Sequence, residues 1–182
     1  TLGRATIAAG KVDDGMKEIR TAQQKSHGTW LFMETLATAL TDNHRALEAV
    51  EFLETTKTED RSAKHWVALG KAQRFVGADD KAKAAYDEAL NQDDGAVDAM
   101  IGQALLLSQQ KKYDEASPWF EKAVEVYANY PDIYENIGLI WIAQGAHQDA
   151  NAQLLEAERR LISQNAEYGR RQRFYQTVTE AF

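Results

Sequence analysis

A tandem repeat limits what this chain of 182 residues can fold into. In residues 63–96, large apolar residues stand at positions 4 and 24 of the unit, and small residues stand at positions 8, 20 and 27. Closely similar residue types return, without a gap, in residues 97–130 and 131–164. Position 4, for example, holds Trp66, Met100 and Tyr134. A fixed period of about 34 residues predicts helical units that stack on one another.

The first clear unit carries a recognisable motif. Trp66, Leu69 and Gly70 give W-x2-L-G, and Ala82 and Tyr86 then give A-x3-aromatic. With these residues in register in three units, the chain resembles the tetratricopeptide repeat family. The resemblance implies an all-α fold, a right-handed α-solenoid of antiparallel helix pairs with a C-terminal capping helix. Small residues would let the paired helices approach closely, and large apolar residues would fill the space between them.

The register is less regular toward the N-terminus. Leu2, Gly3 and Gly10 match positions 7, 8 and 15 of a partial unit, so we expect the chain to be a piece of a longer one. Aligning Trp30 with position 4 puts Glu34 at position 8, where a small residue belongs. We expect a single repeat domain over residues 1–182, with a lengthened loop at 56–61. Its expected units are about 1–26 (partial), 27–62 (irregular), 63–96, 97–130 and 131–164, followed by a capping helix at 165–182.

Composition excludes several functions. Cysteine is absent, which excludes a disulfide framework and any cysteine-containing metal site or nucleophile. The chain has no run of about 18 apolar residues, so no transmembrane segment is predicted. The formal net charge is -7, and residues 92–156 carry 11 acidic but only 3 basic side chains. An acidic body argues against nucleic acid as a partner, because phosphate binding needs basic surface. The composition suits the cytosol and the periplasm equally.

The sequence carries no catalytic signature. It lacks a phosphate-binding loop, H-E-x-x-H, G-x-S-x-G and G-x-G-x-x-G. The four histidines are spread over three of the expected units, at predicted helix ends or loops, so they are expected to be ordinary surface residues. Trp66 and Trp141 occupy repeat positions that face the core, and a core role is expected for both. We therefore predict neither an enzyme nor a bound cofactor or metal.

The resemblance implies that certain first-helix residues line a concave groove that binds a protein or peptide segment. These are positions 2, 5, 9, 12 and 13 of each unit. Several of them are apolar although core packing does not obviously need them, which suggests a partner surface. The predicted contacts are Val67, Lys71, Arg74, Phe75, Asp98, Ile101, Leu105, Gln109, Asp132, Glu135, Leu139 and Ile142.

The sequence therefore predicts a non-catalytic protein-protein interaction scaffold. One alternative is a structural spacer within a larger repeat array, such as an envelope assembly or polysaccharide-export scaffold. Another is the docking arm of a regulator whose active domain lies outside this chain. Self-association also stays open, because the exposed end units of repeat arrays can pair. Fold-level resemblance alone does not select among these roles.

Overall fold

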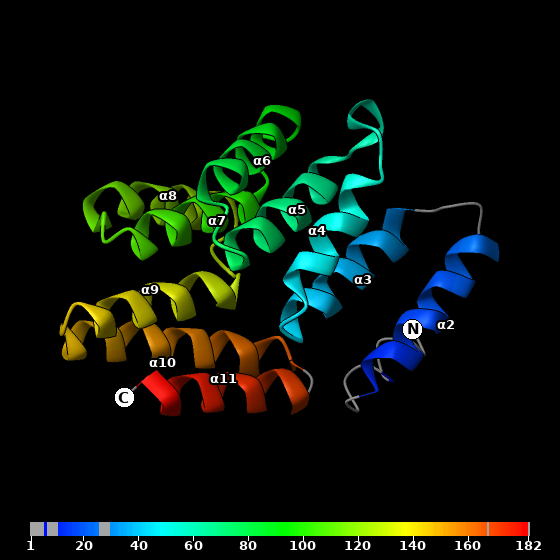
Figure 1. The fold of residues 1–182 in the computed structure, drawn as a ribbon. Coiled ribbons are helices and arrows are strands. Elements are labelled where there is room, and N and C mark those ends of the chain that lie inside the picture. Colours follow the sequence, from blue (N-terminus) through cyan, green and yellow to red (C-terminus); the bar gives the residue numbers. More distant parts are fainter. Residues whose placement is uncertain (1–5, 7–10, 26–29, 167, 182) are drawn as a thin grey trace. The chain divides into compact units, whose positions relative to one another are not determined.

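The computed structural model describes residue 6 and residues 11–25, 30–166 and 168–181, and the regular structure in this part of the chain is all helical. The all-α prediction is therefore confirmed (Figure 1). The chain divides into two compact units, Thr1–Gly102 and Gln103–Phe182. Leu2, Gly3 and Gly10, which were matched to a partial repeat, lie outside the described residues.

The unit Thr1–Gly102 is built from antiparallel helix pairs. Helix α3 pairs with α4, and α5 pairs with α6. Their apolar faces meet in one core that includes Leu36, Leu40, Leu53 and Leu69. The helices are α2 (Val12–Lys25), α3 (Trp30–Asp42), α4 (Ala46–Glu54), α5 (Ala63–Phe75) and α6 (Asp79–Gln92), and helix α7 (Val97–Gln109) runs across the boundary of the unit.

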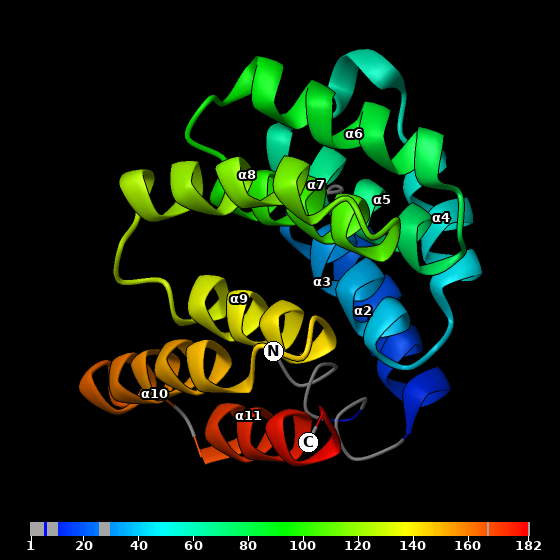
Figure 2. The ribbon, with the colours of Figure 1, turned by 90° about the vertical axis from the view of Figure 1, so that its left-hand side faces the viewer.

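The unit Gln103–Phe182 contains one closely packed pair and a last helix. Helix α9 packs along α10, and α11 lies against both of them (Figure 2). Phe174 of α11 is buried together with Leu154, Ala157 and Leu161 of α10. Helix α11 thus occupies the residues expected for a capping helix. The helices of this unit after α7 are α8 (Tyr113–Val126), α9 (Pro131–Ala143), α10 (His147–Ser163) and α11 (Tyr168–Ala181).

Small residues at position 8 allow the paired helices to touch. A Cβ atom added to Gly70 would lie 2.7 Å from the ring of Tyr86, at position 24 of the same unit. A Cβ added to Gly138 would lie 2.7 Å from the side chain of Leu154, which again is position 24. The repeat pattern therefore reflects a direct contact, in which a missing side chain on one helix makes room for a large one on its partner.

The turn that ends each first helix corrects the register of the irregular unit. Residue 15 of the unit takes a positive φ at Gly77 (77°), Lys111 (60°) and Gly145 (79°). His44 has the same conformation, with φ 60°. Its turn makes the same pair of backbone hydrogen bonds, from His44 N to Thr41 O and from the next amide to Leu40 O. His44 is therefore position 15, and this unit begins at Trp30.

The corrected register removes the conflict at Glu34. Trp30 takes position 1 instead of position 4, and Glu34 moves from the small position 8 to position 5. Position 8 then belongs to Ala37, which is buried. The alignment of Trp30 with position 4 was wrong by three residues, because it relied on an aromatic residue and not on the turn.

The loop between α4 and α5 is long because α4 ends early and not because residues are inserted. The corrected unit, residues 30–62, has 33 residues, one fewer than the period of 34, so the expectation of a lengthened loop was wrong. Helix α4 ends at Glu54, and a short 3-10 helix, Thr58–Asp60, follows before α5 begins. The hydroxyl of Ser62 accepts a hydrogen bond from the backbone N–H of His65, which caps the N-terminus of α5.

Candidate functional site

In the unit Thr1–Gly102, two first helices lie side by side. Lys71 of α5 reaches Asp42 of α3, with 2.9 Å between Nζ and Oδ1. The pair is partly exposed, so water weakens the attraction. Lys71 is one of the predicted groove residues, and its charge is already matched by a neighbouring helix.

The side chains of the other predicted contacts in this unit differ in how much of their surface is exposed. Phe75 is 51% exposed and lies under the guanidinium of Arg74, which is 4.9 Å from the ring centroid. Burial raises the pKa of the Tyr86 hydroxyl, and a hydrogen bond from Arg74 partly offsets this rise. Val67 is half-buried and Asp98 is exposed. Ile101 is only 7% exposed, so the expectation of a solvent-facing apolar side chain does not hold there.

In the unit Gln103–Phe182, the last helix covers the predicted acidic contacts. Arg170 of α11 donates to Asp132 and to Glu135 of α9. Burial would lower the pKa of Arg170, but the hydrogen bonds to the two carboxylates raise it overall. Asp132 and Glu135 therefore face a cation of their own chain.

The remaining predicted contacts of this unit are partly packed. Ile142 is half-buried against the cluster that contains Phe174 and Leu154. Leu139 and Leu105 are half-buried, and Gln109 is exposed. The structure brings Ile142, Asp132 and Glu135 together under α11, which leaves Leu139 and Leu105 as the more accessible apolar members. The concave-groove assignment of these residues stays a prediction.

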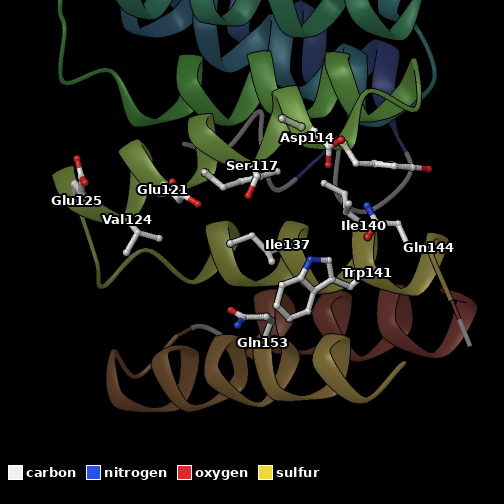
Figure 3. Close-up of a pocket in the computed structure, with 13 residues that line it drawn as sticks. Asp114, Ser117, Glu121, Val124, Glu125, Ile137, Ile140, Trp141, Gln144 and Gln153 are labelled. Atoms are coloured by element: carbon white, nitrogen blue, oxygen red, sulfur yellow. The ribbon is translucent and has the colours of Figure 1, made fainter. Parts of the chain in front are cut away.

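A cavity of about 640 Å³ opens between α8 and α9, in the unit Gln103–Phe182 (Figure 3). Apolar side chains from both helices line it, among them Phe120, Ile137 and Trp141. These three stand at repeat positions 24, 7 and 11, which the pattern assigns to the packed core. Here the two helices leave space between them, and Trp141 is only half-buried.

The charged side chains that line the cavity are all acidic. Asp114, Glu121 and Glu125 project from one face of α8, and Ser117 lies between them (Figure 3). Sequence reasoning missed this site because it treated Ile137 and Trp141 as filled core. The spacing of the three carboxylates on one helix face was the available signal.

The structure changes the interpretation of one histidine. His65 was expected at the surface, but it is fully buried, with 0% exposed. Its Nε2 lies 3.0 Å from the carbonyl oxygen of Leu53. Burial lowers the pKa of His65, and the positive charge of Arg61 also lowers it. His65 of α5 is thus in hydrogen-bond contact with the last turn of α4.

Metal clusters and membrane spans are not found in the described part of the chain. The described residues contain no group of three or more histidine or acidic side chains that could hold a metal ion. None of the described helices is both long and apolar enough to cross a membrane.

Sequence comparison matches parts of the chain to known proteins. The family model described as "Tetratricopeptide repeat" matches residues 97–130. A curated relative, the "General transcriptional corepressor trfA" of Dictyostelium discoideum, is 25% identical over 96 residues. The match covers 53% of this chain and 7% of that protein, so the chain spans a small part of its length.

Solved structures of similar fold cover nearly the whole chain. The thermophilic TPR protein TTC0263 of Thermus thermophilus aligns with a TM-score of 0.76 and 17% identity, covering 98% of this chain and 96% of the other. MamA aligns with a TM-score of 0.61 and 18% identity, covering 92% and 98%. YrrB, described as a TPR protein with an unusual peptide-binding site, aligns with a TM-score of 0.54 and 13% identity, covering 87% and 82%. At these identities the likeness shows the fold, which is that of a helical repeat.

Proposed function

Because the chain belongs to the tetratricopeptide repeat family, we propose that it is a non-catalytic scaffold that binds a segment of a partner protein. The fold is of the kind used for protein-protein interaction, and the described residues offer open apolar surface. Repeat units of this kind present rigid helix faces, so little free energy is lost in ordering the site before binding.

The observation that carries the proposal is the cavity between α8 and α9. Ile137 and Trp141 line it and are only half-buried, at positions that packing would normally cover. Apolar surface left in contact with water costs about 25 cal/mol per Å² relative to burial. A bound segment would recover that free energy, which makes the cavity the better supported of the two binding surfaces.

The first-helix residues of each unit form the other binding surface of the proposal. In the unit Thr1–Gly102, Phe75 is the accessible apolar member, and Arg74 would favour an acidic residue in the ligand. Lys71, by contrast, is already paired with Asp42. In the unit Gln103–Phe182, Leu105 and Leu139 are the more accessible apolar members. Resemblance to the family supports this surface, as does the exposed ring of Phe75. The covering of Asp132 and Glu135 by Arg170 weakens its acidic end.

Affinity capture with matched variants tests the proposal. The chain would be immobilised and exposed to lysate of the source organism, and retained proteins would be identified by mass spectrometry. Ser117→Trp places a bulky side chain in the cavity from an exposed helix position. Thr179→Trp places the same side chain on the exposed face of α11 and serves as the control. The double variant Leu105→Glu and Leu139→Glu tests the first-helix surface.

We expect a partner that wild type and Thr179→Trp retain equally and that Ser117→Trp loses. Loss only in the double variant would move the binding site to the first-helix surface. Absence of any specifically retained protein would contradict the scaffold proposal. Circular dichroism of each variant shows that a lost partner does not reflect unfolding.

A further inference from the structure

We propose that the cavity between α8 and α9 takes a segment in which arginine or lysine side chains alternate with apolar ones. This inference rests on the proposed function and names the chemistry of the partner. It follows from the distribution of charge and apolar surface around the cavity.

The charge of the cavity has one sign. Asp114, Glu121 and Glu125 line it, whereas no lysine, arginine or histidine does among the described residues. Along α8 they are separated by seven and four residues, so all three lie on one face of the helix, at the edge of the cavity (Figure 3). None of the three forms an ion pair with another described residue. A cationic ligand would find three carboxylates whose charge is not already neutralised nearby.

The opposite wall explains why the cation should be a side chain. Ile137, Ile140 and Trp141 of α9 line the cavity across from the carboxylates (Figure 3). Arginine and lysine bury their methylene stems on apolar surface while the charged end reaches polar groups. An indole ring also attracts a cation over its face. The same unit already uses such a contact, since the guanidinium of Arg160 lies 4.0 Å from the ring centroid of Tyr134.

Other occupants match the cavity less well. A metal ion would need closely grouped ligands, and no such group occurs among the described residues. A small polyamine would match the carboxylates but would leave the apolar wall in water. A segment with alternating basic and apolar side chains satisfies both walls. The unit Gln103–Phe182 as a whole carries 11 acidic and 8 basic side chains, a net negative charge that also favours the approach of a basic segment.

Fluorescence anisotropy with defined peptides tests the inference. The probe is a labelled short peptide in which arginine and leucine alternate. One control peptide replaces each arginine with glutamate, and a second replaces each leucine with serine. The test variant is Asp114→Asn, Glu121→Gln and Glu125→Gln. The control variant is Glu115→Gln, Asp149→Asn and Glu180→Gln, which changes the net charge equally at exposed positions outside the cavity.

We expect the test variant to bind the arginine–leucine peptide about tenfold more weakly than wild type does. The control variant should change the affinity by no more than about twofold, the effect of long-range charge alone. Both control peptides should bind more weakly than the probe. Spermine added at a concentration that supplies as many positive charges as the probe peptide should not displace the probe.

Four results would overturn the inference. An equal loss in both variants would assign the binding to net charge and not to the cavity. If the peptide with serine in place of leucine bound as tightly as the probe, the apolar wall of the cavity would not contribute to binding. Self-association that the test variant abolishes would make a second copy of the chain the occupant. If the captured natural partner binds wild type and the test variant equally, this inference fails while the scaffold function stands.

Discussion

Nη2 of Arg170 in α11 lies 2.5 Å from Oε2 of Glu135 in α9, and the same nitrogen also donates to Asp132. The Glu135 side chain is only 12% exposed. Burial raises the pKa of Glu135, while the hydrogen bond and positive charge of Arg170 counter the rise. Without its partner, this carboxylate would be left buried and uncompensated, so the ion pair helps to hold α11 on α9.

Arg170→Gln should loosen α11. Charge-assisted hydrogen bonds of this kind contribute about 1.5–3 kcal/mol, so amide exchange in α11 should become about tenfold faster or more. Hydrogen exchange measured by mass spectrometry reports this directly. Arg173→Gln removes the same charge from an exposed position of the same helix and should change exchange little. Equal acceleration in both variants would mean that the ion pair does not hold the helix.

Gly70→Ala should destabilise the unit Thr1–Gly102. The added Cβ would come within 2.7 Å of Cε1 and 2.8 Å of Cδ1 of Tyr86, a ring that is itself fully buried. Overpacking of this kind costs about 1–3 kcal/mol. Urea denaturation measures the change in the free energy of unfolding.

Gly169→Ala provides the control for Gly70. Gly169 also lies in a helix, but outside its chain neighbours and its own helical backbone nothing lies within 4 Å of an added Cβ. Alanine should therefore stabilise α11 by up to about 1 kcal/mol through helix propensity. A gain at both positions would show that Tyr86 moves aside without cost.

The sequence predicted most of the fold because the repeat pattern encodes a physical contact. In the sequence, a small residue is followed sixteen residues later by a large one, as in Gly70 and Tyr86 or in Gly138 and Leu154. The structure places the two members of each pair in contact.

The irregular unit escaped prediction because Trp30 was aligned with position 4, and its turn residue, His44, gave no signal to correct this. Lys111 gives none either, but the other positions of its unit keep the register. A glycine in a sequence indicates that the backbone can adopt a positive φ, whereas a histidine gives no such indication.

The candidate site was less predictable. The pattern places Ile137 and Trp141 in the core, but it cannot report how closely α8 approaches α9. The approach of two helices depends on the summed packing of both, which no single position encodes. Ile101 shows the reverse case: the sequence predicted an exposed groove residue, but the side chain is buried. Likewise, nothing in the motif around Asp132 indicates that Arg170 will cover it.

His65 should make the chain less stable in mild acid. Burial holds the pKa of His65 below its ordinary value of 6.5. Between that lowered pKa and 6.5, the unfolded chain binds a proton that the folded chain does not, so the free energy of unfolding falls as the pH falls. The contribution is fully present above 6.5 and is lost progressively below it. Urea denaturation between neutral and mildly acidic pH measures the slope.

His65→Gln isolates the contribution of the imidazole. Glutamine can still donate to the carbonyl of Leu53 but does not titrate, so the stability of this variant should depend less on pH in the same range. His44 and His147 are exposed and remain in the variant as a common background. An unchanged pH slope would assign the acid sensitivity to other groups.

His44→Gly should stabilise the chain by about 1 kcal/mol, because a non-glycine residue pays about 1–2 kcal/mol for left-handed backbone. His44 has φ 60°, the conformation that Gly77 and Gly145 adopt at the equivalent turns. Ala84→Gly introduces the same residue at an exposed position inside α6 and should instead cost about 1 kcal/mol. Thermal and urea denaturation would compare both variants with wild type. A loss of stability in His44→Gly would contradict the placement of His44 at position 15, and with it the register that begins at Trp30.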